Sequence, residues 1–157
     1  MLFRSVTVAP VGGESGKREA NLITDLNNWN RQTTLGEVFS SSTIFKLPLG
    51  SRRSPDAAWL ELSRWNSLTL DEQEKFPPLA PDFVIELRSR TDDVSDLKEK
   101  MIEYRNNGVR LGWLINPQDR QVEIYRLDHE VETLQSPNTL SGEDVLPGFI
   151  LNLNTVW

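Results

Sequence analysis

The chain contains no cysteine and only one histidine, His129. Without cysteine the protein has no disulfide framework, no thiolate nucleophile and no zinc site based on sulfur. A single histidine, placed between Asp128 and Glu130, is too little for a His-rich metal site and is typical of a polar surface loop. A metal site in this protein would therefore be made of carboxylates.

Long apolar runs are also absent, since no hydrophobic stretch approaches the length needed to span a bilayer. The first residues, MLFRSVTVAP, lack the apolar segment and small-residue cleavage site of a secretory signal. We therefore expect a cytoplasmic protein with no membrane partner. The chain has no Gly-rich phosphate loop and no Gly-x-Ser-x-Gly motif, so kinase-like and serine-hydrolase functions have no support.

Basic residues are outnumbered: 17 Lys and Arg face 23 Asp and Glu, for a net charge of −6. This balance argues against a protein that coats nucleic acid by electrostatics alone. It leaves open an enzyme that acts on nucleic acid, because a carboxylate site becomes attractive to phosphate once a divalent cation is bound.

The length of 157 residues predicts a single domain over residues 1–157, with residues 1–14 as an irregular N-terminal arm. Hydrophobic periodicity predicts an α/β fold with helices on a mixed sheet, in the order helix, three strands, helix, two strands. The first helix begins near Ser15–Lys17 and the second runs from Thr91–Ser95 to Gly108. The expected strands are Thr43–Leu49, Asp56–Leu62, Asp82–Ser89, Leu111–Ile115 and Gln121–Arg126, with one more short strand near Val131–Leu134.

One expected strand carries a carboxylate, Glu86, inside the apolar run Phe83–Leu87. A buried carboxylate is costly unless it has a proton, a cationic partner or a metal. Asp56 starts the preceding strand, and adjacent strands would bring the two carboxylates together, which suits Mg²⁺. Two alternatives stay open: Asp56 caps a turn after Pro55, and Glu86 pairs with Arg88, which lies on the same side of the strand.

Two cations are candidates for this site, Arg88 and Lys100. Lys100 lies on the second helix, four residues before Tyr104, and can lean toward the end of the preceding strand. The alternative for Lys100 is an ion pair with Asp96 or Glu103 on the helix surface. Glu19 lies on the inward stripe of the first helix, where it is either a site residue or a complement to the helix dipole.

Four segments together resemble one known family: SPDAAWL, PDFVIELRSR, EKMIEYRNNGVRLGWLINPQDRQVEIYR and EDVLPGF. They are similar to the Uma-type restriction endonuclease family of the PD-(D/E)XK nuclease superfamily, over about Gly12 to Trp157. The resemblance implies a restriction-endonuclease-like αβββαβ core with a phosphodiesterase site that depends on Mg²⁺ or Mn²⁺.

By the same resemblance, Asp56 and Glu86 are the metal ligands, and Glu19 matches an acidic residue often found on the first helix. Arg88 stands where the superfamily has its lysine, and Lys100 fits a catalytic lysine that has moved to the following helix. The predicted function is a divalent-metal-dependent endonuclease acting on DNA, with a homodimer expected by analogy because a two-fold pair can cut both strands. The alternative is an inactive nuclease fold that binds nucleic acid or protein, with Glu86 and Arg88 as an inert ion pair.

Overall fold

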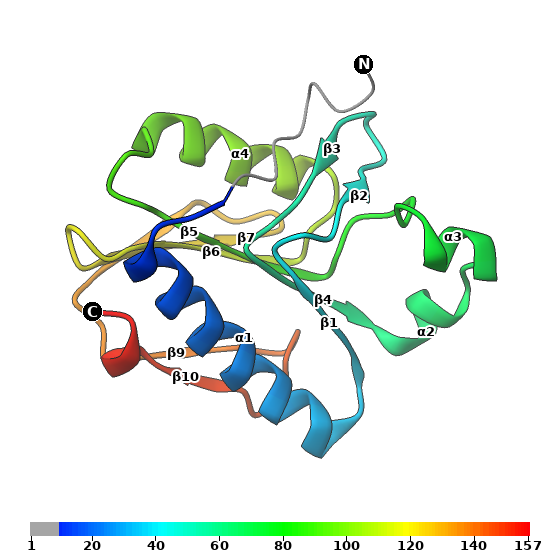
Figure 1. The fold of residues 1–157 in the computed structure, drawn as a ribbon, viewed down its shortest axis with the longest axis horizontal. Coiled ribbons are helices and arrows are strands. Elements are labelled where there is room, and N and C mark those ends of the chain that lie inside the picture. Colours follow the sequence, from blue (N-terminus) through cyan, green and yellow to red (C-terminus); the bar gives the residue numbers. More distant parts are fainter. Residues whose placement is uncertain (1–9) are drawn as a thin grey trace.

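A six-stranded mixed sheet forms the middle of the protein in a computed structural model, which describes residues 10–157 (Figure 1). The helices are α1 (Gly13–Thr33), α2 (Leu62–Asn66), α3 (Leu70–Glu74) and α4 (Val94–Asn106), with a 3₁₀ turn, η1 (Leu153–Thr155). The strands are β1 (Gly36–Ser40), β2 (Phe45–Lys46), β3 (Arg52–Arg53), β4 (Ala57–Glu61), β5 (Phe83–Leu87), β6 (Leu111–Asn116), β7 (Gln121–Arg126), β8 (Glu132–Gln135), β9 (Thr139–Ser141) and β10 (Ile150–Asn152).

The sheet has the strand order β1-β4-β5-β6-β7-β8. Strands β1, β4 and β5 form an antiparallel meander, and α4 then carries the chain to β6, which lies parallel to β5. A helix between two parallel neighbours is the expected crossover connection. The core order is therefore αβββαβ, and the predicted fold class is confirmed.

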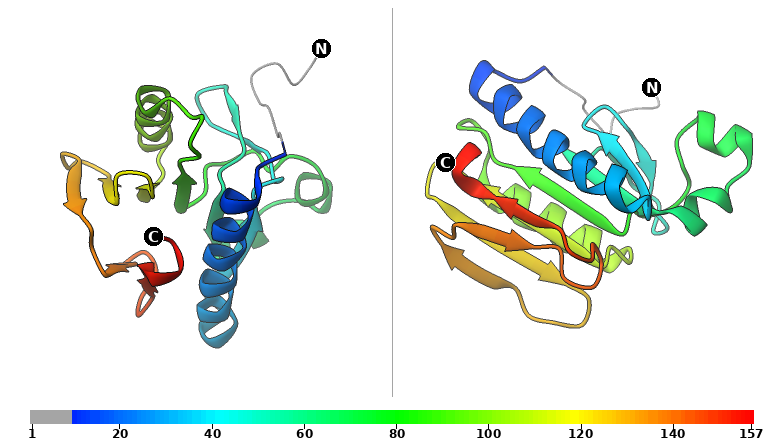
Figure 2. Two further views of the ribbon diagram at one scale, coloured as in Figure 1. Left: turned by 60° about the vertical axis from the view of Figure 1, so that its left-hand side comes forward. Right: turned by 90° about the horizontal axis from the view of Figure 1, so that it is seen from below.

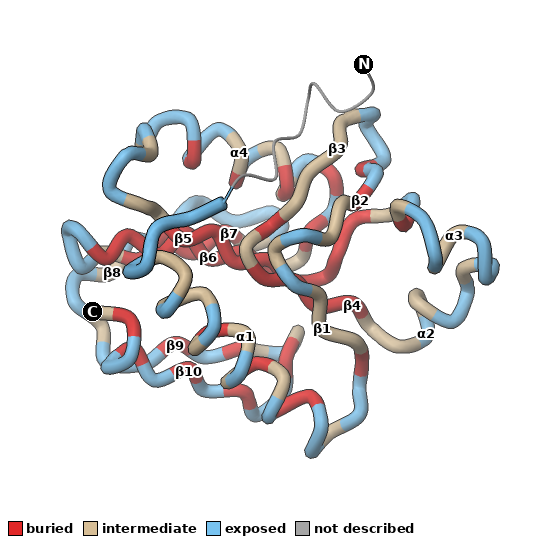
Figure 3. The backbone as a smooth tube through the Cα atoms, viewed as in Figure 1, coloured by how far each residue is buried: buried red, intermediate tan, exposed pale blue. Residues whose placement is uncertain are grey.

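Each face of the sheet has its own hydrophobic core, because side chains alternate along the strands. Helix α1 and the β9–β10 hairpin cover one face, where Phe83, Ile85 and Leu87 of β5 are buried (Figure 2). Helix α4 covers the other face, where Val84 is buried. The central strands β5, β6 and β7 are the most continuously buried part of the chain (Figure 3). Across residues 10–157, no helix combines the length and apolarity required to cross a membrane.

The predicted first strand, Thr43–Leu49, is wrong, since the first strand of the sheet is β1 at Gly36–Ser40. Within the predicted range only β2 is extended, and it pairs with β3 outside the main sheet. A Cβ at Gly36 would lie 2.3 Å from the carbonyl oxygen of Leu60 and 2.5 Å from the ring of Trp59. Only glycine permits this close approach, but glycine has a low strand propensity. The sequence pattern therefore gave no strand signal at Gly36.

The helix boundaries differ from expectation by a few residues. Helix α1 begins at Gly13, two residues before the expected range, so residues 13 and 14 belong to the helix rather than to the expected arm. Residues 1–9 of that arm lie outside the described residues. Helix α4 begins inside its expected window, with the Asp93 side chain accepting from the Ser95 N–H, and ends before Gly108 at a φ of 96°.

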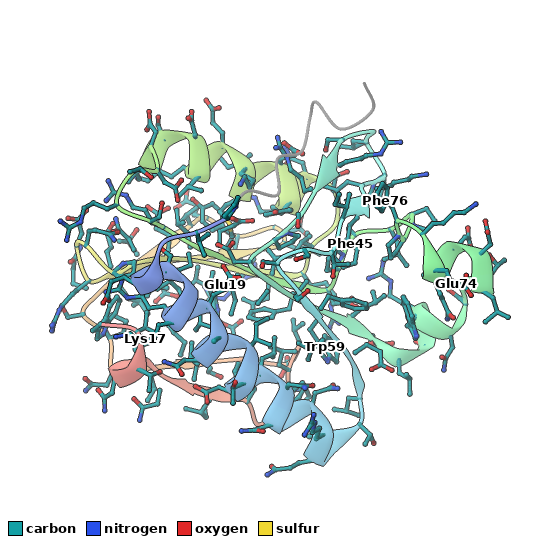
Figure 4. All side chains as sticks on the ribbon, in the orientation of Figure 1. Lys17, Glu19, Phe45, Trp59, Glu74 and Phe76 are labelled. Carbon is teal, nitrogen blue, oxygen red and sulfur yellow. The ribbon has the colours of Figure 1, made fainter. Side chains whose placement is uncertain are left out.

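Trp59 and Asn30 join α1 to the sheet. The Trp59 indole donates to Asn30 Oδ1 at 2.9 Å, and the Trp29 ring packs edge-on against Trp59 at 5.7 Å. Figure 4 shows Trp59 between α1 and the strands. This contact sets the position of α1 and hence of Glu19, which lies nearer the N-terminal end of the same helix.

Asp82 precedes β5 and is 2% exposed. Its Oδ2 accepts from the Glu61 N–H at 2.8 Å, and its Oδ1 lies 3.1 Å from Arg64 and 3.6 Å from Arg110. These contacts tie β4 to β5 at the end of β5 opposite Glu86.

We predict that Asp82→Ala lowers the free energy of unfolding by about 1.5–3 kcal/mol, because hydrogen bonds to a buried charged group are lost. Urea unfolding measures the change. The matched control is Asp71→Ala, whose ion pair with Lys75 is exposed on both sides and should contribute less than about 1 kcal/mol. Equal losses in the two variants would contradict a structural role for Asp82.

Candidate active site

Glu86 lies in the middle of the sheet with its carboxylate under α4, and it is 3% exposed. The Tyr104 hydroxyl donates to Glu86 Oε2 at 2.6 Å, and Lys100 Nζ lies 3.6 Å from Glu86 Oε1. Lys100 and Tyr104 are one helical turn apart on α4, so both reach the same carboxylate. Desolvating a carboxylate costs several kcal/mol, whereas a hydrogen bond to a charged group returns about 1.5–3 kcal/mol. Glu86 therefore needs both partners.

Asp56 lies directly before β4, at the point where the β4–β5 ladder ends. The last paired residues are Ala57 and Ile85, which places Asp56 opposite Glu86 in the antiparallel register. Asp56 Oδ2 accepts from the Leu87 N–H at 2.7 Å and so takes the place of the next ladder bond. Oδ1 makes no hydrogen bond with any described residue. The carboxylates of Asp56 and Glu86 are thus held side by side by backbone geometry.

The two carboxylates line a cleft of about 1000 Å³. Glu19, Arg90, Lys100 and Gln118 line it as well, from α1, the β5–α4 loop, α4 and the β6–β7 turn respectively. Figure 4 shows Glu19 on the side of α1 nearer the strands, while Lys17 lies on the outer side. Of the five residues that the sequence suggested for the site, four line this cleft and one, Arg88, does not.

Arg88 turns toward the β6–β7 turn. Its guanidinium donates to Asn116 Oδ1 at 3.3 Å and lies 3.5 Å from Asp119 Oδ2, and its Nε donates to the Asp92 carbonyl at 3.4 Å. No ion pair between Arg88 and Glu86 is found among the described residues. The alternative pairing of Lys100 with Glu103 is also not found there, because Glu103 binds Arg53 at 2.8 Å.

The sequence profile of the Uma2 family, described as "Putative restriction endonuclease", matches residues 4–154. The chain belongs to the Uma2 family. This confirms the family that the sequence motifs indicated. No curated protein sequence matches this Uma2 chain.

Solved structures support the same fold for this Uma2 protein. One, from Anabaena variabilis, is described as a "putative nuclease belonging to DUF820" and superimposes with a TM-score of 0.81. The match covers 94% of the Uma2 chain and 82% of that structure's chain at 18% sequence identity. At that identity the likeness concerns the fold.

The Uma2 site fits a hard divalent cation by its donor chemistry. Asp56 Oδ1 is a carboxylate oxygen without a hydrogen bond to the described residues, and Glu86 Oε1 has an ion pair with Lys100 at 3.6 Å. Mg²⁺ accepts one or two carboxylates and keeps several waters, so a pair of ligands suffices. Within residues 10–157, no three His, Cys, Asp or Glu side chains gather closely enough to hold a metal by themselves.

The electrostatics of the Uma2 site favour a cation. Burial, with the nearby charge of Glu86, raises the pKa of Asp56 to about 8, and Glu19 adds to the effect. Burial also raises the pKa of Glu86, against the opposing charge of Lys100. The pKa of Tyr104 is raised well above its usual value, so its hydroxyl keeps its proton and donates to Glu86.

The sequence predicted site roles for Asp56, Glu86, Glu19 and Lys100, which line one cleft, but gave no role to Tyr104, Arg90 or the Leu87 N–H. The spacing of Lys100 and Tyr104 was the available signal for Tyr104, because residues four apart share a helix face. Arg90 lies in a polar loop that has no periodicity, and the hydrogen bond from the Leu87 N–H to Asp56 depends on tertiary register. Neither feature leaves a mark in the sequence.

The raised pKa of Asp56 predicts that the metal-free protein loses stability as pH rises from about 4 to about 8. In this window the folded state holds a proton that the unfolded state has released, so the free energy of unfolding falls by up to about 1.4 kcal/mol per pH unit. Asp56→Asn should flatten this slope and be more stable than the wild type at pH 8. Urea unfolding in EDTA at pH 5, 6.5 and 8 measures both effects.

The control for this experiment is Asp71→Asn, since Asp71 is exposed and its variant should keep the wild-type slope. A wild-type slope that survives in Asp56→Asn would mean that another group takes up the proton.

Proposed function

We propose that this Uma2 protein is a divalent-metal-dependent endonuclease that hydrolyses phosphodiester bonds in DNA. The observation that carries the proposal is the pair of carboxylates, Asp56 and Glu86, held beside Lys100 in one cleft. Mg²⁺ or Mn²⁺ is the cofactor, with Asp56 and Glu86 as its ligands. When bound, such an ion supplies an activated water and neutralises charge on the phosphate.

The protein's own groups position the reaction. Lys100 presents an ammonium with three donors beside Glu86, where it orients the attacking water and balances the charge of the carboxylate. Glu19 lines the cleft from α1, and its charge acts on Asp56. Phosphodiester hydrolysis depends mainly on positioning and charge neutralisation, so this small set suffices.

Lys100 is the better candidate for the catalytic cation, although the superfamily motif points to Arg88. The Arg88 side chain is 20% exposed and contacts Asn116 and Asp119, which holds the β6–β7 turn near the cleft. Lys100 faces Glu86 directly. We therefore assign Arg88 to positioning of the turn and Lys100 to the chemistry.

Because DNA is negatively charged, its binding at a cleft rich in carboxylates requires positively charged side chains nearby. Arg18 lines the cleft but donates to the Val156 carbonyl at 2.7 Å, and Lys100 is paired with Glu86. Arg90 is exposed in the cleft wall and makes no ion pair or hydrogen bond with the described part of the chain. Arg90 is thus the side chain that is available for a backbone phosphate.

The alternative function, an inactive nuclease fold used for binding, rested on an inert ion pair between Glu86 and Arg88. The described contacts of Arg88 do not include Glu86, so that ion pair is not found, while the inactive fold itself stays an alternative that the cleavage assay below tests. A homodimer and a cytoplasmic location stay predictions.

We predict that purified protein cleaves plasmid DNA with Mg²⁺ or Mn²⁺ and not with EDTA. Asp56→Asn and Glu86→Gln should each lower the cleavage rate at least about 10²-fold, because each removes a charge from the metal site. Lys100→Ala should lower the rate by a similar factor, whereas Arg88→Ala should have a smaller effect. Supercoiled-plasmid nicking, followed by gel densitometry, measures all four variants.

The matched control is Lys98→Ala, because Lys98 lies on the same helix but pairs with Glu123 at 3.2 Å instead of Glu86. This variant should cleave within about twofold of the wild type. Cleavage that survives in Glu86→Gln would point to a contaminant or a different site, and loss only in Arg88→Ala would reverse the assignment of the cation.

We predict that Arg90→Ala weakens DNA binding and lowers the slope of log affinity against log salt by about 1, since one phosphate contact is lost. Fluorescence anisotropy in the Glu86→Gln background measures binding without cleavage. Arg31→Ala is the charge-matched control, as Arg31 lies in the last turn of α1, far along the helix from the cleft. A salt slope unchanged in Arg90→Ala would refute the phosphate contact.

A further inference from the structure

The two tyrosines of the chain both donate to a buried glutamate on the α4 side of the sheet. Tyr104 donates to Glu86 Oε2 at 2.6 Å, and Tyr125 donates to Glu123 Oε1 at 2.7 Å. The two glutamates lie two strands apart in register, on either side of Leu114 in β6. The sheet therefore carries the same tyrosine–glutamate contact twice.

Each glutamate also has a lysine partner from α4. Lys100 lies 3.6 Å from Glu86, and Lys98 lies 3.2 Å from Glu123. The two trios share residue types and sheet face, and both lysines come from α4, but Tyr104 lies on α4 whereas Tyr125 lies on β7.

The surroundings differ in one respect that concerns a ligand. Glu86 lines the cleft beside Asp56, whereas Glu123 is not among the described residues that line it. Tyr125 lies two residues after Glu123 on the same strand and donates to its carboxylate. Lys98, the lysine partner of Glu123, is 47% exposed. The second trio therefore lies outside the cleft and serves as a comparison for the first.

Tyr104 is held by packing as well as by its hydrogen bond to Glu86. It is 1% exposed and is packed in one core cluster with Leu97 and Met101 of α4. Its backbone carbonyl accepts from the Val109 N–H at 3.1 Å, just beyond the end of α4 at Asn106. The hydroxyl therefore has a fixed position relative to β5.

A glutamate side chain has three rotatable bonds, so one fixed donor decides which carboxylate oxygen is free. With Oε2 held by Tyr104, Oε1 is the oxygen left for Lys100 and for a ligand in the cleft. We propose that Tyr104 is a positioning residue that presents the Glu86 carboxylate for binding of a divalent cation. This inference rests on the proposed metal site. Groups that orient a ligand in this way typically contribute 10- to 100-fold to metal affinity.

The test is Mn²⁺ binding to the DNA-free protein, measured by isothermal titration calorimetry. Tyr104→Phe should raise the Mn²⁺ dissociation constant at least about tenfold. Tyr125→Phe removes the equivalent hydroxyl from the second trio and should leave the dissociation constant within about twofold of the wild type. Equal affinities in the wild type and Tyr104→Phe would overturn the proposal, as would equal losses in both tyrosine variants.

A second measurement leaves the hydroxyl in place and so avoids any folding defect of Tyr104→Phe. Since the chain has two tyrosines, protein labelled with 3-fluorotyrosine gives two ¹⁹F signals, and Tyr125→Phe assigns them. Saturating Mg²⁺ should shift the Tyr104 signal and leave the Tyr125 signal in place. An unmoved Tyr104 signal at saturation would refute the contact between this hydroxyl and a metal ligand.

Failure of this inference and failure of the proposed function are distinguishable in the same titrations. If Asp56→Asn binds Mn²⁺ as tightly as the wild type, the metal site itself is wrong and the inference falls with it. If Asp56→Asn weakens binding and Tyr104→Phe does not, the metal site stands and only the role of Tyr104 is refuted.

Discussion

The burial of the Glu86 carboxylate in the centre of the sheet is the constraint on which the site depends. A charge there is stable only with several partners, and α4 supplies two of them from one face, Lys100 and Tyr104. Asp56 lies opposite, so the charge of Glu86 adds to burial in raising the pKa of Asp56. A divalent cation bound between the two carboxylates would neutralise their negative charge and so stabilise this part of the sheet.

The elements predicted correctly from the sequence are those with a regular spacing of apolar residues. The element that was missed depends on a single close tertiary contact. The stripe of α1 and the strand β5 follow from spacing and residue type. Strand β1 was missed because Gly36 is chosen for its contact with Trp59, not for its propensity. Tertiary contact, and not local preference, decided that element.

The site shows the same division. Asp56 and Glu86 were predicted because a carboxylate in an apolar strand is chemically conspicuous, and Lys100 because helix spacing directs it toward that strand. The direction of Arg88 could not be predicted, because alternation along β5 ends before it and the β6–β7 turn captures its guanidinium. Alternation within a strand does not extend to the residue after it.

The β4–β5 ladder joins only three pairs of residues, from Trp59–Phe83 to Ala57–Ile85. Glu86, Lys100 and Tyr104 belong to one continuous segment of chain, β5–α4–β6, whereas Asp56 reaches them across that short ladder. Opening of the ladder would separate the carboxylates while the crossover unit remained closed. A cation bound by both would link β4 to the β5–α4–β6 crossover at the end of a ladder of only three residue pairs.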